Sequence, residues 1–249
     1  MITCLTIRYF QLLVVCINHR IIILRLGFCM TLDTHNGVKV YTPTALKLYD
    51  WWVLNISNRY AWRCDTDKYL LPHFKNNLGE NHMDIGVGTG FYLKRALANI
   101  NKIALTDLNI NSLDYAKKNI VDDKLTYCLQ HDIYHKFPNE FNSSFDSISL
   151  FYLLHCLPGT MEGKKKVIEN ISKILTEKGV LYGATILGAD VEHNFFGNKL
   201  MSVYNKKGIF SNYSDSADAL EKVLSCFFYD VSIHIQGVVA LFTARNKKL

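Results

Sequence analysis

Between residues 82 and 186, short apolar segments alternate with stretches that have the spacing of amphipathic helices. The apolar segments are His82–Ile85, Ile103–Thr106, Leu125–Leu129, Asp146–Phe151 and Val180–Ile186. The helical stretches between them are Tyr92–Ala98, Ser112–Asn119 and Lys164–Leu175. Strands that alternate with helices at this pitch need crossover connections, which build a parallel sheet with helices on both faces. The expected fold class is therefore α/β, with a doubly wound, mostly parallel sheet.

The C-terminal region breaks this alternation. After a helical stretch at Ala217–Cys226, two segments with strand character, Tyr229–Ile235 and Val238–Ala244, are separated only by Gln236 and Gly237. A connection of two residues is too short for a crossover helix, so the two strands must form an antiparallel hairpin. The sequence therefore predicts a seven-stranded sheet that ends in an antiparallel hairpin.

A helical region precedes the alternating pattern. Thr42 and Pro43 suit the start of a helix, and apolar residues follow at spacings of three and four up to Ile56. A second helix is expected at Thr66–Asn76, with a bend at Pro72 because proline cannot donate a backbone hydrogen bond.

The first 29 residues differ in character from the rest of the chain. They contain three arginines and no acidic residue, and a polar segment at residues 18–20 interrupts their apolar stretches. No apolar run therefore reaches the ~18 to 20 residues that a membrane-spanning helix needs. The most economical interpretation is that translation begins at Met30 and that residues 1–29 are a non-native or dispensable extension. A weak membrane anchor is the alternative.

Composition narrows the classes of partner and compartment. The 249 residues are 49% apolar and 20% charged, which fits a large globular domain rather than a disordered chain. The net charge is +6, and without the three N-terminal arginines 25 basic residues against 22 acidic ones leave +3. So mild a charge argues against nucleic-acid binding. The seven cysteines form no Cys-x-x-Cys pair, which argues against a metal cluster and favours reduced thiols in the cytoplasm.

A glycine-rich loop follows the first strand of the alternating region. Its sequence is Asp84-Ile85-Gly86-Val87-Gly88-Thr89-Gly90, and a helical stretch comes next. Glycines at these positions allow a sharp turn and let backbone N–H groups approach a ligand with no side chain between them. The dinucleotide-binding fingerprint has a third glycine where this chain has Phe91, so the loop departs from a nicotinamide site.

Acidic residues also follow the next two strands. Asp107 comes 21 residues after Gly86, where a carboxylate can accept hydrogen bonds from both hydroxyls of a ribose. Asp132 follows the third strand and could accept from an adenine amino group, with Leu108 and Ile133 covering the faces of the ring. A single acidic residue at a strand end is as often a turn or helix cap. Three of them behind one glycine loop favour a cofactor site.

These features resemble those of the class I S-adenosylmethionine-dependent methyltransferases. The resemblance is carried by the acidic-x-Gly-x-Gly-x-Gly loop, Asp107, Asp132 and the terminal hairpin, and residues 36–245 align with the family in order. It implies a Rossmann-like methyltransferase fold with S-adenosylmethionine as the cofactor. The expected cofactor-binding residues are Asp84, Gly86, Gly88, Gly90, Asp107, Leu108, Asp132 and Ile133.

The end of the fourth strand bears on the methyl acceptor. Residues 153–159, Leu-Leu-His-Cys-Leu-Pro-Gly, resemble a segment of a bacterial and fungal subgroup that acts on small molecules. Methyltransferases of exocyclic amino groups in DNA carry Asn or Asp followed by Pro-Pro-Tyr or Pro-Pro-Phe here, whereas this chain has Phe151-Tyr152-Leu153-Leu154. The resemblance therefore implies a small-molecule acceptor, no nucleic acid and no membrane partner. The attacked atom and the oligomeric state stay open.

His155 is the first candidate for a general base, because a neutral imidazole works near pH 7 and the residue follows the fourth strand. His193, after the fifth strand, is a weaker candidate. The alternative for His155 is a structural histidine that forms a hydrogen bond with the backbone. A base is needed only if the nucleophile arrives protonated.

The resemblance also divides the chain into regions. Residues 30–80 would form an N-terminal helical lid, and residues 81–249 the methyltransferase core, with a substrate-facing insert near 189–215. Two groups of aromatic residues would meet over the methyl end of the cofactor: Tyr41, Tyr49, Trp51, Trp52, Tyr60 and Trp62 in the lid, and Phe195, Phe196, Tyr204, Phe210 and Tyr213 in the insert. The alternative for each tryptophan is the apolar face of a helix.

Two alternative functions stay open at this point. The first is a non-catalytic protein that keeps the cofactor site as a sensor or as the partner of an active subunit. The second is a nicotinamide-dependent oxidoreductase, which Phe91 and the terminal hairpin disfavour.

Overall fold

The computed structural model describes residues 11–17, 20–26, 52–97, 100–120 and 123–248. The chain divides into two compact units, residues 1–42 and residues 43–249. The smaller unit contains an antiparallel pair of strands, β1 (Gln11–Ile17) and β2 (Arg20–Leu26). The sequence analysis assigned no element to this segment, although its β-branched residues favour strands.

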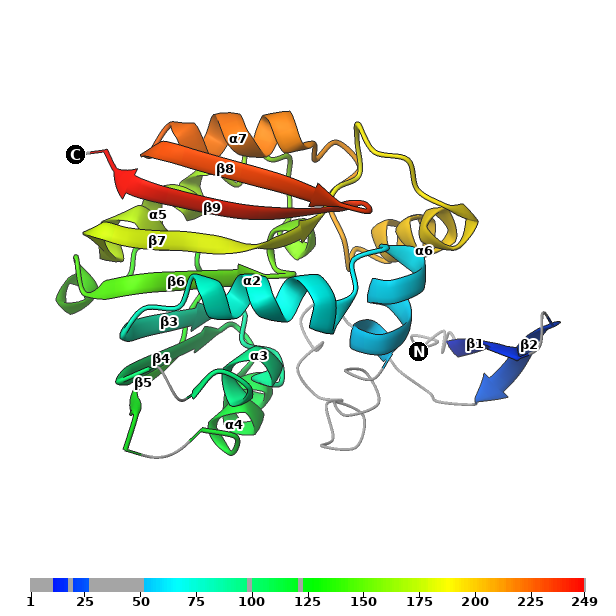
Figure 1. The fold of residues 1–249 in the computed structure, drawn as a ribbon, viewed down its shortest axis with the longest axis horizontal. Helices are drawn as coiled ribbons and strands as arrows, with labels where there is room; N and C mark the ends of the chain where they lie inside the picture. The colour runs from blue at the N-terminus through cyan, green and yellow to red at the C-terminus, as the bar shows by residue number, and fades with distance from the viewer. Residues whose placement is uncertain (1–10, 18–19, 27–51, 98–99, 121–122, 249) are drawn as a thin grey trace, which may run out of the picture. The chain divides into compact units, whose positions relative to one another are not determined.

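The larger unit is built on a seven-stranded sheet (Figure 1). Its strands are β3 (Asn81–Ile85), β4 (Lys102–Asp107), β5 (Leu125–Gln130), β6 (Phe145–Phe151), β7 (Leu175–Ile186), β8 (Phe228–Gln236) and β9 (Val239–Lys247). Their order across the sheet is β5-β4-β3-β6-β7-β9-β8. The first five are parallel to one another, and β9 is antiparallel to both β7 and β8. The predicted doubly wound sheet with a terminal antiparallel hairpin is therefore confirmed.

Helices cover both faces of the sheet. They are α2 (Leu71–Asn76), α3 (Phe91–Lys94), α4 (Ile110–Lys117), α5 (Lys165–Ile174), α6 (Phe195–Lys206) and α7 (Ala217–Ser225). Shorter or wider helical segments are η1 (Trp52–Ala61), η2 (Thr66–Leu70), η4 (Asn139–Phe141) and η5 (Leu154–Cys156). The π-helical η2 passes into α2 just before Pro72, so the type of helix changes inside the segment predicted as one helix. The part of the first expected helix at residues 42–51 lies outside the described residues.

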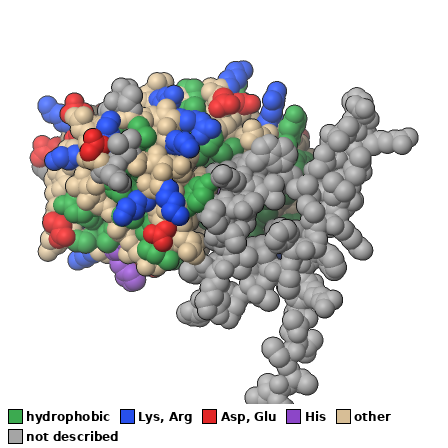
Figure 2. Space-filling view, turned by 90° about the horizontal axis from the view of Figure 1, so that it is seen from below, with side chains coloured by type: hydrophobic (Ala, Val, Ile, Leu, Met, Phe, Trp, Pro, Cys, Tyr) green, Lys and Arg blue, Asp and Glu red, His purple; other side chains and the backbone are tan. Residues whose placement is uncertain are grey.

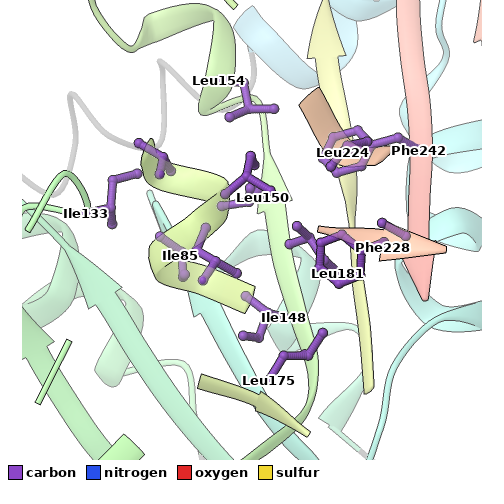
Figure 3. Packing of buried hydrophobic residues seen from close by; sticks show 14 of the residues in the cluster. Ile85, Ile133, Ile148, Leu150, Leu154, Leu175, Leu181, Leu224, Phe228 and Phe242 are labelled. Atoms are coloured by element: carbon purple, nitrogen blue, oxygen red, sulfur yellow. The ribbon is translucent and has the colours of Figure 1, made fainter. Parts of the chain in front are cut away.

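Two hydrophobic cores result from the alternation of side chains along the strands. Ile148 and Leu150 of β6 pack with α5 and α7 in the first core, which also contains Leu181 (Figure 3). Phe151 and Tyr182 point to the opposite face and pack with α2, α3 and α4 in the second core. Successive side chains of a strand point to opposite faces of the sheet, and helices cover both faces. The central strands are therefore apolar on both faces.

Two elements differ clearly from their predicted extents, and one helix was not predicted. α3 has four residues instead of reaching Ala98, and β7 begins at Leu175 rather than at Val180. α6 lies inside the region in which the sequence predicted only an insert. Its first turn contains Gly197, a poor helix former, but the side chain of Asn194 caps the helix by accepting a hydrogen bond from the Gly197 N–H.

Surface charge is mixed on the side that Figure 2 presents. Lys and Arg side chains lie among Asp and Glu side chains on the described part of this face (Figure 2). Among the described residues, no helix combines the length and the apolar character needed to cross a lipid bilayer.

Candidate active site

The glycine-rich loop leaves the carboxyl end of β3 with three residues in the left-handed region of backbone space. The φ angles are +75° at Gly86, +52° at Gly88 and +71° at Gly90, and only glycine adopts such angles without strain. A Cβ at Gly86 would lie 3.0 Å from Leu153, and one at Gly90 would lie 3.2 Å from Ala116. A Cβ at Gly88 would have no neighbour within 4 Å among the described residues. Within that part of the chain Gly88 therefore faces free volume, as a loop that admits a ligand must.

Asp107 lies directly beside this loop, at the carboxyl end of β4. Its Oδ2 accepts a hydrogen bond from the Gly88 N–H at 3.4 Å, and its Oδ1 accepts from the Asn109 N–H at 2.8 Å. Burial raises the pKa of Asp107, and the surrounding backbone N–H groups oppose that shift. The neighbouring Leu108 has 64% of its surface exposed and so offers apolar surface beside this carboxylate. A carboxylate and a free apolar surface thus lie side by side, as a ribose and its attached base require.

Asp132 and Ile133 follow β5. The Oδ1 of Asp132 accepts from the Tyr134 N–H at 3.0 Å, so this oxygen caps a turn, as the alternative interpretation anticipated. Ile133 is only 6% exposed and packs in the first core (Figure 3). Of the two side chains expected to cover an adenine ring, only Leu108 offers a large free surface.

Asp84, the first of the three acidic residues behind the glycine loop, lies near the end of β3 and is only 5% exposed. The hydroxyl of Ser149 on β6 donates a hydrogen bond to its Oδ1 at 2.5 Å. Burial, and to a lesser extent the Asp107 carboxylate, raise the pKa of Asp84 to about 7, although the Ser149 bond opposes this. The sequence analysis did not single out Ser149. The signal was present, because Ser147 and Ser149 place two hydroxyls on one face of an otherwise apolar strand.

His155 is enclosed after β6 and is 2% exposed. Its Nδ1 accepts from the backbone N–H of Ile186 at 3.2 Å, and its ring packs edge-on against Phe210 at 4.5 Å between centroids. Burial, helped by the positive charge of Lys164, lowers the pKa of His155 to about 3. These contacts match the structural alternative for His155, and a group with so low a pKa is a weak base near pH 7. A catalytic role stays a hypothesis.

His193 lies in the segment between β7 and α6. Its Nε2 donates to the carbonyl oxygen of Leu187 at 2.8 Å, and its Nδ1 is buried without a hydrogen-bond partner among the described residues. Burial lowers the pKa of His193. Both histidines therefore have a ring nitrogen committed to the backbone.

Aromatic side chains from several segments meet beyond the carboxyl ends of β6 and β7. Trp62, which follows η1, lies 6.1 Å from Phe210, and Tyr152 lies 5.5 Å from His155, between ring centroids. Tyr204 of α6 completes the group at 4.9 Å from Phe210. The N-terminal helical region and the insert thus contact each other, as expected. The lid aromatics Tyr41, Tyr49 and Trp51 lie outside the described residues.

Tyr152 is a further residue that the sequence analysis did not identify as part of the site. Its φ is +57°, an uncommon value for a residue with a bulky side chain. Its hydroxyl is buried and has no hydrogen-bond partner among the described residues. Backbone strain of this kind is often found at functional sites.

The side chains described in the structure include no group of three or more His, Cys, Asp or Glu that could hold a metal ion. Cys64, Cys128, Cys156 and Cys226 are free thiols. The loop volume at Gly88, the Asp107 carboxylate and the exposed Leu108 instead fit an organic cofactor that carries a ribose.

Comparisons with known proteins identify the family of the chain. A family model described as a methyltransferase domain matches residues 83–181. A physcion biosynthesis cluster O-methyltransferase of Aspergillus chevalieri is 40% identical over 219 residues, which cover 87% of this chain and 97% of that protein. The uncharacterized YbcY protein of Escherichia coli K12 is 49% identical over 195 residues, which cover 78% of this chain and 100% of that protein.

Solved structures show the same fold. A phosphoethanolamine N-methyltransferase of Haemonchus contortus, in complex with S-adenosylhomocysteine, superposes with a TM-score of 0.59 at 16% identity, covering 86% of this chain and 48% of that one. The N-methyltransferase NodS of Bradyrhizobium japonicum, also with S-adenosylhomocysteine, gives 0.51 at 15% identity, covering 71% and 84% of the two chains. The methyltransferase domain match and the O-methyltransferase relative favour a methyltransferase over the sensor and oxidoreductase alternatives. The chain belongs to the class I S-adenosylmethionine-dependent methyltransferases.

Proposed function

We propose that this protein transfers the methyl group of S-adenosylmethionine to an oxygen atom of a small organic molecule. The observation that carries the proposal is the similarity over nearly the whole length of the Aspergillus chevalieri O-methyltransferase. A second O-methyltransferase, from Aspergillus niger, is 35% identical and covers 84% of this chain. The sequence left the attacked atom open, and these relatives favour oxygen.

The residues around the glycine loop would hold the cofactor. Asp107 would accept from the ribose hydroxyls, and Leu108 would cover one face of the adenine. The Oδ2 of Asp132, which lies 4.0 Å from Nδ1 of His135, would accept from the adenine amino group. The free volume at Gly88 and the carboxylate of Asp84 would receive the methionine portion, whose amino group is cationic. Gly86 and Gly90 supply the backbone shape, and Ile133 supports the pocket from the first core.

The bound cofactor supplies an electrophilic methyl group on a sulfonium. Attack by a lone pair of the acceptor oxygen would form the new C–O bond and break the C–S bond, whose electron pair would stay on sulfur. Alignment of the two partners can account for ~7 to 11 kcal/mol of the barrier. The aromatic group of Trp62, Tyr152, Tyr204 and Phe210 would exclude water and offer ring faces to the positive charge.

The acceptor oxygen must also lose a proton. His155 and His193 both have lowered pKa values, so each is a weak base in this structure. An acidic hydroxyl, such as a phenol with a pKa near ~10, demands less of a base than an aliphatic alcohol. We therefore propose a phenolic acceptor. A cytoplasmic location is proposed as well, because the described cysteines are free thiols and two of them are exposed.

Product analysis tests the proposal. The protein would be incubated with S-adenosylmethionine and a matched set of small phenols, alcohols, amines and thiols, and methylated products would be identified by mass spectrometry. We expect methyl ethers from phenols, together with S-adenosylhomocysteine. Methylation of amines or thiols alone would overturn the assignment to oxygen. The Gly88→Val variant is the blank, because its added side chain would occupy the free volume at the loop.

A further inference from the structure

A line of buried polar side chains runs beneath the glycine loop, between β3 and β6. His82 pairs with Ser147 in the register of these strands, and Asp84 pairs with Ser149. His82, Ser147 and Ser149 are fully buried, and Asp84 is 5% exposed. Four polar groups in adjacent positions of two central strands need hydrogen-bond partners, because a buried polar group without one is costly.

The hydrogen bonds along this line are continuous. The Gly79 N–H donates to Ser147 Oγ at 2.8 Å, and the same oxygen lies 2.8 Å from His82 Nδ1. The other ring nitrogen, His82 Nε2, lies 3.2 Å from Ser149 Oγ, and that hydroxyl donates to Asp84 Oδ1 at 2.5 Å. The line thus extends from the backbone of Gly79 to the carboxylate of Asp84.

The positions of the protons on Ser147, His82 and Ser149 follow from how many hydrogen bonds each group can donate. An ionised carboxylate only accepts, so the single proton of Ser149 is used on Asp84, and the bond between Ser149 and His82 needs the proton on His82 Nε2. Burial lowers the pKa of His82 to about 3, so the ring is neutral and carries one proton only. Its Nδ1 therefore accepts from Ser147, whose oxygen accepts from Gly79. Every bond in the line then runs toward Asp84.

We propose that Ser147, His82 and Ser149 form a hydrogen-bond relay that orients the Asp84 carboxylate for the cationic amino group of the cofactor. One carboxylate oxygen is occupied by Ser149, and the second lies outside the relay. His82 and Ser149 are positioning residues in this account. The inference rests on the proposed role of Asp84 in holding the methionine portion.

The electrostatic surroundings of Asp84 support this assignment. Asp107 on β4 adds negative charge, the phenol of Tyr182 on β7 lies close enough for its pKa to be raised by Asp84, and neutral His82 is on β3 itself. Among the residues that the structure describes, the groups that shift the pKa of Asp84 include no cation, and the bond from Ser149 is the one that favours its ionised form. A cationic ligand would therefore stabilise the ionised form of this buried carboxylate.

Calorimetric titration with S-adenosylhomocysteine between pH 6 and pH 8.5 tests the relay. In the wild type, affinity should rise with pH as Asp84 ionises around its pKa of about 7. Ser149→Ala should weaken binding ~10-fold or more at pH 7 and move the rise to higher pH, because the ionised carboxylate loses its donor. Thr106→Val is the matched control, since it removes a buried hydroxyl on β4 that has no hydrogen-bond partner among the described residues. It should leave the pH profile unchanged.

A second measurement does not depend on a variant folding. Nitrogen NMR of the wild type at pH 8, where Asp84 is ionised, should find His82 neutral with its proton on Nε2. A proton on Nδ1, or a Ser149→Ala profile that superposes on the wild-type profile, would overturn the relay.

Asp84→Asn separates this inference from the proposed role of Asp84. If Asp84→Asn weakens S-adenosylhomocysteine binding while Ser149→Ala behaves like Thr106→Val, the relay is wrong and the role of Asp84 stands. If Asp84→Asn binds as well as the wild type, Asp84 does not hold the ligand and the relay has no function in binding.

Discussion

At the scale of single residues, backbone conformation and burial carry most of the information about the site. The sharp turn of the loop could be predicted from Gly86, Gly88 and Gly90, because glycine adopts positive φ angles at little cost. The contacts of His155 could not be predicted, because its partner Ile186 lies 31 residues away on another strand. The same holds for Ser149 and Asp84, whose pairing depends on the register of β3 and β6.

Asp107→Ala should weaken S-adenosylhomocysteine binding much more than it weakens the fold. Loss of a charge-assisted acceptor for the ribose removes ~1.5 to 3 kcal/mol, or about 10- to 150-fold in affinity. Calorimetric titration measures this change. Asp114→Ala, which removes an exposed carboxylate on α4, is the control and should bind normally. An unchanged dissociation constant in Asp107→Ala would remove Asp107 from the site.

Gly88→Val should abolish binding while the protein stays folded. The new Cβ meets no atom of the described residues within 4 Å, but the residue adopts a strained φ of +52°, at a cost of ~1 to 3 kcal/mol, and its side chain fills the volume meant for the ligand. Gly208→Val is the matched control, because Gly208 has a φ of +68° and equally free surroundings. Both variants should lose similar stability in thermal unfolding, and only Gly88→Val should lose binding. Equal binding by the two would contradict the glycine-loop account.

His155→Ala should lower stability and affect turnover only modestly. With a pKa of about 3 in the folded protein and ~6.5 in the unfolded chain, the neutral ring contributes stability that is complete above pH ~6.5 and is lost as the pH falls toward 3. Thermal unfolding across this range should show a shallower pH dependence in the variant. A stable variant whose turnover falls ~100-fold or more, with loss of a kinetic pKa near 6 to 7, would instead identify His155 as the base.

At the scale of elements, strands were predicted more accurately than helices. All seven strands of the larger sheet were predicted. The central strands β3, β4 and β6 are short apolar segments buried on both faces, whereas the edge strands β5 and β8 are largely exposed. The start of β7 was missed because Leu175–Gly179 is polar and resembles a loop. α6 was missed because its apolar periodicity is weak, and its stability depends on a cap and on packing against other segments.

A buried ion pair connects the start of α5 to the segment between α6 and α7. Lys164, at the start of α5, donates to Asp215 at 2.6 Å and to the carbonyl oxygen of Ser211 at 2.8 Å, and both charged side chains are fully buried. Lys164→Met should cost about 3 to 5 kcal/mol, because it leaves the Asp215 carboxylate buried without its cation. Chemical denaturation measures the loss. The double variant Lys164→Met/Asp215→Leu should recover most of it, and an unaffected single variant would show that the pair is not needed.

At the scale of the whole molecule, connection lengths determined the topology that could be predicted. The crossover helices required parallel strands, and the two-residue connection at Gln236 and Gly237 required the antiparallel end. The pair of β1 and β2 was not predicted, because residues 1–29 were interpreted as a dispensable extension and were assigned no element.

The protein that starts at Met30 should bind S-adenosylhomocysteine as tightly as the full chain. Residues 1–42 form a compact unit of their own, so the methyltransferase unit is not expected to depend on the first 29 residues. Thermal unfolding and titration of the two proteins side by side measure the difference. A lower melting temperature together with weaker binding would make the segment part of the functional fold.

The most direct test of the account is a crystal structure of the protein with S-adenosylhomocysteine. We predict that the ribose hydroxyls donate to Asp107, that the adenine lies against Leu108 and reaches Asp132, and that the amino group of the ligand lies within hydrogen-bond distance of Asp84. A ligand bound elsewhere, or bound here with Asp107 turned away from its ribose, would contradict the site proposed for this methyltransferase.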